Sequence, residues 1–181
     1  IFGNVYSADG VNPDPEKVSA IQALRPPESK EEMRTFLGML TYLSQFIPRL
    51  SEATEPFRKL IKENAVFQWD ETYHVLFDEI KGLVKADTTL AYYDRTKPVY
   101  VQCDASKQGL GSALVQEGRP IAYASKSLIE TESWYAPIEL EMLAVLYSVK
   151  KFRQYLYGRI FVVQSDHKPL QYIRRKNLRL A

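Results

Sequence analysis

The stretch Pro98-Val-Tyr-Val-Gln-Cys-Asp-Ala-Ser106 is the segment from which the fold can be derived, because a short apolar run ends there in a carboxylate. The three residues after the proline favour β-structure, and a proline is tolerated at the first residue of a strand. A carboxylate at the end of a buried strand costs free energy unless it is paired, and a divalent cation is one suitable partner. The alternative is that Asp104 simply begins a turn, since Asp and Ser favour turns.

Composition sets limits on the class of protein. The chain has 181 residues, 45% of them hydrophobic, which is enough for one good core or two small domains. Its formal net charge is +2, so nucleic-acid binding has to come from local basic patches. The single cysteine, Cys103, excludes an internal disulfide and is expected to be a buried structural thiol. No apolar run approaches the roughly 20 residues of a membrane span. The chain starts at Ile1 without a methionine and ends at Ala181 in a basic run, so we expect it to be a fragment of a longer protein.

The first third of the chain is expected to form a β-hairpin and then a small helical unit. Asp9-Gly10 is a strong turn pair between short apolar segments. Helical spacing predicts a helix over 16–24 and another that begins after Ser29, a capping-box residue, and runs to about Ile47. Ser51 can cap a further short helix. A plain helical packing module would show the same pattern.

The remainder alternates helical and strand patterns, as a layered α/β domain does. Asp70 is a good N-cap for a helix that runs to about Val84. Three strands, a long helix from Pro137 to about Tyr157 and a returning strand follow, and a last helix begins after them. The strands are expected over 99–104, 110–116, 120–124 and 160–165, and the last helix over 170–175.

Three carboxylates fall where they could meet. Asp104 and Asp166 end two of the predicted strands, and Glu141 lies on the long helix. At about 100° per residue, Glu141 falls about 60° from the centre of the helix's predicted apolar stripe, whereas Glu139 falls about 100° away on the other flank. The predicted stripe consists of Ile138, Met142, Val145, Val149, Phe152 and Leu156.

Carboxylates gathered in this way repel one another unless cations bind between them. Hard oxygen ligands of this kind suit Mg²⁺ or Mn²⁺, and two ions held together can support phosphodiester cleavage. The alternative for Glu141 is an acid of the first helical turn, favoured there by the helix dipole.

Several motifs carry a resemblance to a known family. Cys103-Asp104-Ala105-Ser106, followed by Gly109-Leu110-Gly111, resembles the first strand pair of retrotransposon ribonuclease H domains. Glu139–Ala144 resembles their catalytic helix, and Ser165–Leu170 resembles the strand end beyond it. Further motifs resemble the primer grip and thumb of reverse transcriptase, at 1–5, 13–18 and 34–38. The chain is thus similar, over nearly its whole length, to the Pol polyprotein of gypsy-type LTR retrotransposons.

The resemblance implies a fold and a division into domains. The expected fold is α/β, a ribonuclease H-like mixed sheet with flanking helices, truncated at its C-terminus and preceded by a small α-helical thumb. The expected boundaries are 1–11 for the end of the reverse transcriptase palm, 12–65 for the thumb and 66–181 for the ribonuclease H-like domain. The family has a fourth carboxylate, whose position is expected beyond Ala181.

The resemblance also implies an activity, namely two-metal-ion endonucleolytic hydrolysis of the RNA strand of RNA–DNA hybrids during reverse transcription. Asp104, Glu141 and Asp166 would be the catalytic acids and would bind two Mg²⁺ or Mn²⁺ ions. The implied partners are template-primer nucleic acid and the rest of the Pol polyprotein, with no membrane. The implied location is the cytoplasm, in the virus-like particle of the element, or the nucleus.

Substrate contacts are expected from polar residues near the strand ends and from a basic run near the C-terminus, although such residues are often only solvated surface. These candidates are Lys107, Ser125, Lys126, His167, Lys168, Arg174 and Arg175, with Arg34, Gln45 and Arg49 as template-primer contacts on the thumb. The first rival function is a host-adopted, catalytically inactive module that binds nucleic acid or protein. A second is a structural connection domain, which normally lacks the acids present here.

Overall fold

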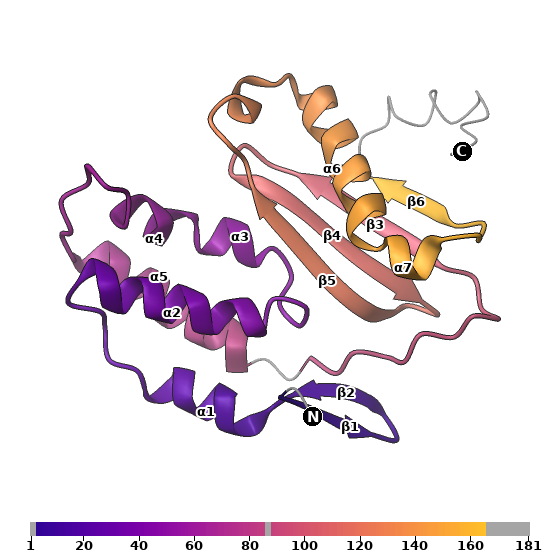
Figure 1. Cartoon of the computed structure of the whole chain (residues 1–181), viewed down its shortest axis with the longest axis horizontal. Helices are drawn as coiled ribbons and strands as arrows, with labels where there is room; N and C mark the ends of the chain where they lie inside the picture. Colours follow the sequence, from indigo (N-terminus) through magenta and orange to yellow (C-terminus); the bar gives the residue numbers. More distant parts are fainter. Residues whose placement is uncertain (1–2, 86–87, 166–181) are drawn as a thin grey trace.

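The computed structural model describes residues 3–85 and 88–165 and comprises two units that lie side by side (Figure 1). One is a cluster of helices preceded by a β-hairpin, and the other is a β-sheet with helices on one face. The predicted α/β architecture with a preceding helical part is therefore observed.

The N-terminal hairpin forms as its turn pair predicts. Strand β1 (Asn4–Ser7) pairs antiparallel with β2 (Gly10–Pro13). Gly10 has φ +142°, and a Cβ at this position would lie 2.1 Å from the carbonyl oxygen of Leu90. The space is needed because Val11 and Leu90 exchange backbone hydrogen bonds of 2.8 and 2.9 Å. The hairpin is thereby attached to the segment that leads into the sheet.

The helical unit begins and ends its helices mostly where the capping residues predict. The carboxylate of Asp14 accepts a hydrogen bond from Glu16 N at the start of α1, and Ser29 Oγ accepts one from Glu32 N at the start of α2. Asp70 Oδ1 does the same for Tyr73 N at the start of α5. The helices of this unit are α1 (Pro15–Ala23), α2 (Lys30–Tyr42), α3 (Leu50–Ala53), α4 (Glu55–Leu60) and α5 (Glu71–Lys85).

Helix α2 is shorter than predicted, since it ends at Tyr42 rather than at Ile47. Leu43 N donates to Leu40 O, a tighter bond than the α-helical one, and the chain then continues in turns. The carbonyl oxygen of Gln45 accepts a 2.9 Å hydrogen bond from Tyr123 N in the sheet. The turns that follow α2 thus carry a contact with the sheet, through a backbone carbonyl that accepts a hydrogen bond from β5.

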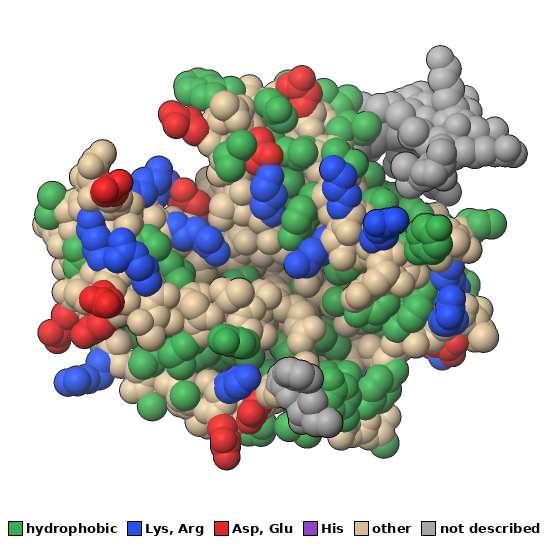
Figure 2. Space-filling model, in the orientation of Figure 1, with side chains coloured by type: hydrophobic (Ala, Val, Ile, Leu, Met, Phe, Trp, Pro, Cys, Tyr) green, Lys and Arg blue, Asp and Glu red, His purple; other side chains and the backbone are tan. Residues whose placement is uncertain are grey.

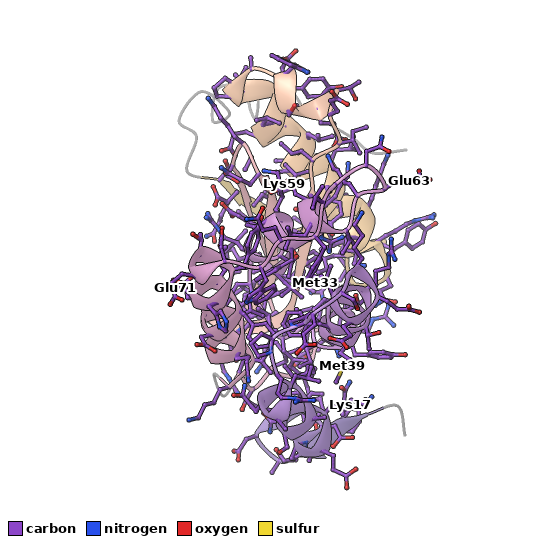
Figure 3. The ribbon with its side chains drawn as sticks, turned by 90° about the vertical axis from the view of Figure 1, so that its left-hand side faces the viewer. Lys17, Met33, Met39, Lys59, Glu63 and Glu71 are labelled. Carbon is purple, nitrogen blue, oxygen red and sulfur yellow. The ribbon has the colours of Figure 1, made fainter. Side chains whose placement is uncertain are left out.

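A core of aromatic and aliphatic side chains holds the helical unit together. Phe36 packs against Phe57 and Phe77, with ring centroids 6.3 and 4.9 Å apart. Met33 is fully buried among the helices, while Glu71 lies at the edge of the view (Figure 3). Helix α5 contributes Phe77, Ile80 and Val84 to this core, so its side chains pack with the helices before it. The boundary at residue 66 stays a prediction.

The sheet places the quoted stretch at its centre. Strand β3 (Tyr100–Ala105) pairs antiparallel with β4 (Gly109–Gln116) and parallel with β6 (Val162–Ser165). Strand β5 (Arg119–Ser127) pairs antiparallel with β4, which gives the order β5-β4-β3-β6. Helices α6 (Pro137–Lys151) and α7 (Arg153–Leu156) cover one face (Figure 1). Three strands precede the helices and one strand follows them, which is the order that the sequence predicted.

The buried face of α6 differs from the predicted apolar stripe. The buried positions are Leu140, Ala144 and Ser148, whereas Ile138 and Met142 of the predicted stripe are exposed. Small side chains let the helix axis approach the sheet closely, and bulkier residues fit better towards the flanks. The predicted single helix to Tyr157 is also interrupted, because the backbone turns at Phe152 before α7.

Hydrogen bonds join the helical unit to the edge strand β5. Ser51 N donates to Ser125 Oγ at 2.9 Å, and Tyr123 N donates to Gln45 O. Ala91 N donates to Pro120 O at 2.7 Å in the connecting segment. The outer edge of β5 is thus partly paired by the preceding unit. Within the described residues, no helix has the length and apolar character of a membrane span.

We predict that Ala144→Leu destabilises the protein by about 1–3 kcal/mol, because the extra carbons cannot enter the contact between α6 and the sheet. The measurement is urea-induced unfolding followed by circular dichroism. Leu146→Ala, at a position that is 50% exposed, is the control and should change the free energy of unfolding by no more than about 0.5 kcal/mol. Equal effects of the two substitutions would contradict this packing.

Candidate functional site

The site is built on the end of β3. Asp104 is the penultimate residue of this strand, and its side chain is 35% exposed. The residue before it, Cys103, is buried and lies opposite Ser165 in the parallel register of β3 and β6. Strands β3 and β6 therefore end close together, and Asp104 stands at that shared end.

Helix α6 brings Glu141 to the same end of the sheet. Its carboxylate oxygen Oε2 accepts a 2.9 Å hydrogen bond from Ser165 Oγ, the last residue of β6. About two turns further along the helix, Ser148 Oγ lies 3.2 Å from Cys103 Sγ and fixes the helix over β3. Glu141 therefore faces the strand ends, as the helical spacing predicted.

Glu139 has a different role. Its Oε2 accepts a 2.8 Å hydrogen bond from Ala136 N, so it caps the N-terminus of α6. This is the solvent-facing and helix-terminal position that the sequence indicated for it. The two carboxylates of this helix are thus separated into one that caps and one that faces the sheet.

Asp166, the third predicted acid, lies outside the described residues, as do His167, Lys168, Arg174 and Arg175. Among residues 3–85 and 88–165, no three His, Cys, Asp or Glu side chains form a group that could hold a metal ion. The described residues thus contribute two of the predicted metal ligands, Asp104 and Glu141.

Arg49 of the helical unit reaches into the site. Its Nη2 forms an ion pair with Asp104 Oδ2, and its Nη1 lies 3.6 Å from Glu52 Oε2. The sequence indicated Arg49 as a template-primer contact and gave no sign that it would reach Asp104. The partners are 55 positions apart (104 minus 49), so only the packing of the two units brings them together.

The remaining substrate candidates in the described part have different environments. Ser125 Oγ is 3.0 Å from Ser51 Oγ and belongs to the contact between the two units. Lys126 Nζ is paired with the buried carboxylate of Glu132 at 2.5 Å. Lys107 is exposed in the turn between β3 and β4. Lys107 is therefore the most accessible of these three for a phosphate contact.

Sequence reasoning missed the residues that position the acids. Gly111 and Ser165 fall within the motifs quoted above, but those motifs gave neither residue a positioning role, and Ser148 lies outside them. The signal in the sequence for Ser165 was its place immediately before the predicted strand-end acid. No local signal pointed to Arg49, because its partner is set by tertiary packing.

Burial raises the pKa of the Cys103 thiol to about 11, and the nearby carboxylate of Glu141 adds to the shift. The hydrogen bond with Ser148 acts in the opposite direction and only partly offsets these effects. The expectation of a buried structural thiol is confirmed.

Lys and Arg side chains extend across one face of the molecule, from the region of α4 over α3 to α6 and α7 (Figure 2). This is the local concentration of positive charge that the near-neutral chain needs for a nucleic-acid contact. Acidic side chains lie at the periphery of this face and also among the basic ones (Figure 2).

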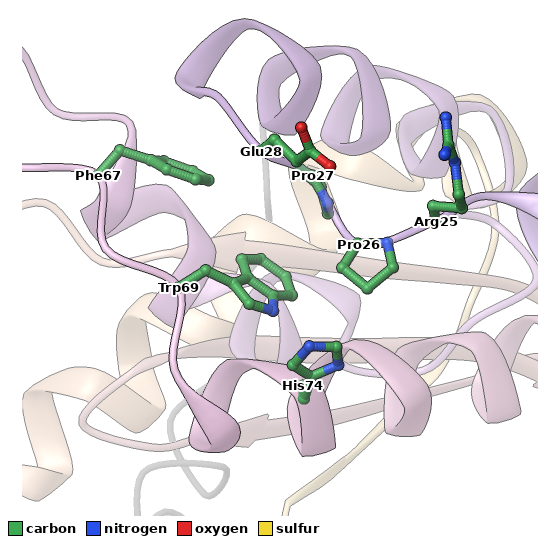
Figure 4. Close-up of a pocket in the computed structure, with 7 residues that line it drawn as sticks. All are labelled: Arg25, Pro26, Pro27, Glu28, Phe67, Trp69 and His74. Atoms are coloured by element: carbon green, nitrogen blue, oxygen red, sulfur yellow. The ribbon is translucent and has the colours of Figure 1, made fainter.

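A separate surface pocket lies in the helical unit and contains no acid pair. It is lined by Arg25, Pro26, Pro27, Glu28, Phe67, Trp69 and His74 (Figure 4). The rings of Trp69 and His74 meet edge to face, with centroids 5.7 Å apart. The prediction that His74 is a surface or packing histidine agrees with this contact.

Comparison with known proteins identifies the class. Residues 94–181 match the family described as RNase H-like domain found in reverse transcriptase, and this part of the chain belongs to that family. The fold of the foamy viral protease-reverse transcriptase, solved in complex with an RNA/DNA hybrid, superposes with a TM-score of 0.83 at 23% identity. That match covers 97% of this chain and 25% of the viral one, and it confirms the predicted ribonuclease H-like fold.

Matches to retroelement proteins narrow the class of protein further. The chain is 35% identical over 173 residues to the Pol polyprotein of transposon 297 from Drosophila melanogaster, covering 95% of this chain. It is 37% identical over 187 residues to that of transposon opus from the same species, covering 94%. The predicted resemblance to gypsy-type Pol polyproteins is thereby confirmed. The chain spans 16% and 19% of the length of these two relatives.

We predict that Cys103 resists alkylation in the folded protein. Its pKa of about 11 means that little thiolate exists at pH 8, and burial blocks access as well. Reaction with iodoacetamide should be slow at pH 8, accelerate as the pH rises towards 11, and become fast in denaturant. Cys103 is the only cysteine in the sequence, so a mass shift reports on it alone. Rapid labelling of native protein at pH 7 would show that the site is open.

We predict that Glu132→Gln lowers stability at pH 7 by about 1.5 kcal/mol through loss of the charged hydrogen bond with Lys126. Burial alone would raise the pKa of Glu132, but hydrogen bonds from Lys126 and Ile129 N outweigh it and lower the pKa below 4.5. Because the pKa of Glu132 is lower in the folded state than in the unfolded state, its charge stabilises the fold fully at pH values above the unfolded-state pKa. This stabilisation is lost as the pH falls through the folded-state pKa, so the difference in stability between wild type and Glu132→Gln should vanish there. Thermal unfolding measures this.

The control for that comparison is Glu130→Gln, at an exposed carboxylate two residues away. It should leave the melting temperature close to that of wild type at each pH. A difference for Glu132→Gln that stays constant below pH 4 would argue against a charged pair.

Proposed function

We propose that this chain is part of a reverse transcriptase–ribonuclease H that hydrolyses the RNA strand of RNA–DNA hybrids. The observation that carries the proposal is the placement of Asp104 and Glu141 at the neighbouring ends of β3 and β6, on an RNase H-like fold. Its relatives are Pol polyproteins, and a structural neighbour was solved with an RNA/DNA hybrid. The substrate class of this chain is inferred from them.

The donor set fits a hard divalent cation. Asp104 is partly exposed, so a hydrated ion can reach it, and its carboxylate already attracts the guanidinium of Arg49. Glu141 accepts a hydrogen bond from Ser165 through one oxygen, which orients the carboxylate. In this proposal Asp104, Glu141 and Asp166 hold two Mg²⁺ or Mn²⁺ ions. Bound there, the ions supply Lewis acidity for attack of water on the phosphodiester.

The protein's own residues provide geometry. Ser165 restrains Glu141, and the buried contact of Cys103 with Ser148 keeps α6 at a fixed height over β3. The basic face seen in Figure 2 attracts the nucleic-acid backbone. The expected products are ends with a 3′-hydroxyl and a 5′-phosphate. The proposed partners are the hybrid and the rest of the Pol polyprotein, in the cytoplasmic particle of the element.

We predict that Glu141→Gln reduces Mg²⁺-dependent cleavage of a labelled RNA–DNA hybrid by at least about 100-fold, because a metal ligand is lost. Asp104→Asn should have the same effect. The assay uses a polypeptide in which this chain is continued past Ala181, so that the fourth carboxylate expected there can take part.

Glu139→Gln is the matched control, since it removes a carboxylate from the same helix that caps the N-terminus instead of facing the strands. It should retain most of the cleavage activity. A folded protein that binds the hybrid but leaves the RNA intact would refute the nuclease and favour the binding module.

A further inference from the structure

We propose that Arg49 is an intramolecular counter-cation for Asp104, which a divalent metal ion has to displace in order to bind. The arginine comes from the helical unit and the carboxylate from the sheet, so metal binding would release a contact between the two units. The inference rests on the metal role of Asp104 proposed above.

The backbone of Arg49 is held in an unusual conformation. It has φ 52° and ψ 28°, the left-handed region that residues with a Cβ rarely occupy. Its neighbours Ile47 and Leu50 are buried in the core of the helical unit, and Ser51 N is bonded to Ser125 Oγ of β5. The chain is therefore anchored on both sides of Arg49, which directs this side chain across the boundary between the units.

Strand β4 leaves room for the arginine. Gly111 lies directly opposite Asp104 in the antiparallel register, and a Cβ on it would lie 3.1 Å from Arg49 Cγ. That distance is tighter than nearly all Cβ contacts in proteins. A side chain at position 111 would therefore push against the stem of Arg49, and glycine leaves the path to Asp104 open.

A guanidinium and a metal ion compete for the same oxygens. The pair is partly exposed, with 54% of the Arg49 side chain and 35% of the Asp104 side chain accessible. Exposed ion pairs are weak, so a divalent cation with a second carboxylate nearby can replace the arginine. Glu141 is the described carboxylate that approaches the same strand ends.

The displaced arginine has a second acceptor. Glu52, on α3, already lies 3.6 Å from Arg49 Nη1, whereas Asp104 is paired with Nη2. The guanidinium can therefore keep one carboxylate partner after it leaves Asp104. The hydrogen bonds of Ser51 with Ser125 and of Tyr123 with Gln45 do not involve Arg49, so the two units stay attached.

The test is Mn²⁺ binding to the whole chain, measured by isothermal titration calorimetry for wild type and Arg49→Gln. If the arginine competes, the variant should bind Mn²⁺ about two- to fivefold more tightly, which is what loss of an exposed ion pair allows. Arg58→Gln is the matched control, since it removes the same charge from an exposed position on α4. Its affinity should equal that of wild type.

Thermal unfolding supplies a second readout. Without metal, Arg49→Gln should melt below wild type because the contact with Asp104 is lost, and saturating Mn²⁺ should abolish the difference. In an Asp104→Asn background, Arg49→Gln should change neither quantity.

The outcomes separate this inference from the proposed nuclease. Equal or weaker Mn²⁺ affinity in Arg49→Gln would overturn the competition while leaving the metal site intact. Absence of Mn²⁺ binding in both proteins would overturn the competition and the metal role of Asp104 together. Tighter binding in the variant with no hybrid cleavage would support the competition and refute only the nuclease.

Discussion

The pairing of β3 with β4 on one side and β6 on the other is the constraint on which the rest of the structure depends. A strand in the middle of a sheet has its backbone groups satisfied on both edges, so its position is strongly fixed. Helix α6 can approach it closely because Ala144 and Ser148 are small. The strand end that carries Asp104 and the height of the helix that carries Glu141 are both set by this packing.

The order of the strands in the sheet also explains how the two units are coupled. Strand β5 is the outer strand on the side of the helical unit, where Tyr123 N donates to Gln45 O and Ser125 Oγ accepts a hydrogen bond from Ser51 N. The turn at Arg49 lies between these two attachments and reaches past β5 to β3. An acid of the sheet thus has its cationic partner in a different unit, which makes the site sensitive to how the units are joined.

Much of the secondary structure could be predicted because its causes are local. Ser29, Asp14 and Asp70 cap helices through hydrogen bonds to residues two or three positions away. The hairpin at Gly10 also depends on nearby residues. The predicted stripe on α6 was wrong at Met142, because hydrophobicity does not reveal how close a helix lies to a sheet. The end of α2 was also wrong, because residues 43–46 form tighter turns with bonds to the third residue before them, and Gln45 in these turns accepts a hydrogen bond from Tyr123 of a distant strand.

By itself the sequence determined the order of strands and helices, the strand-end place of Asp104 and the orientation of Glu141 towards the sheet. These follow from alternation, helical period and turn residues, which act over a few positions. Only the tertiary structure decided that Ser165 orients Glu141, that Lys126 pairs with the buried Glu132, and that Arg49 meets Asp104 beside Gly111. Contacts that bridge separate elements depend on strand register and on how closely the layers pack, and no local pattern encodes that spacing.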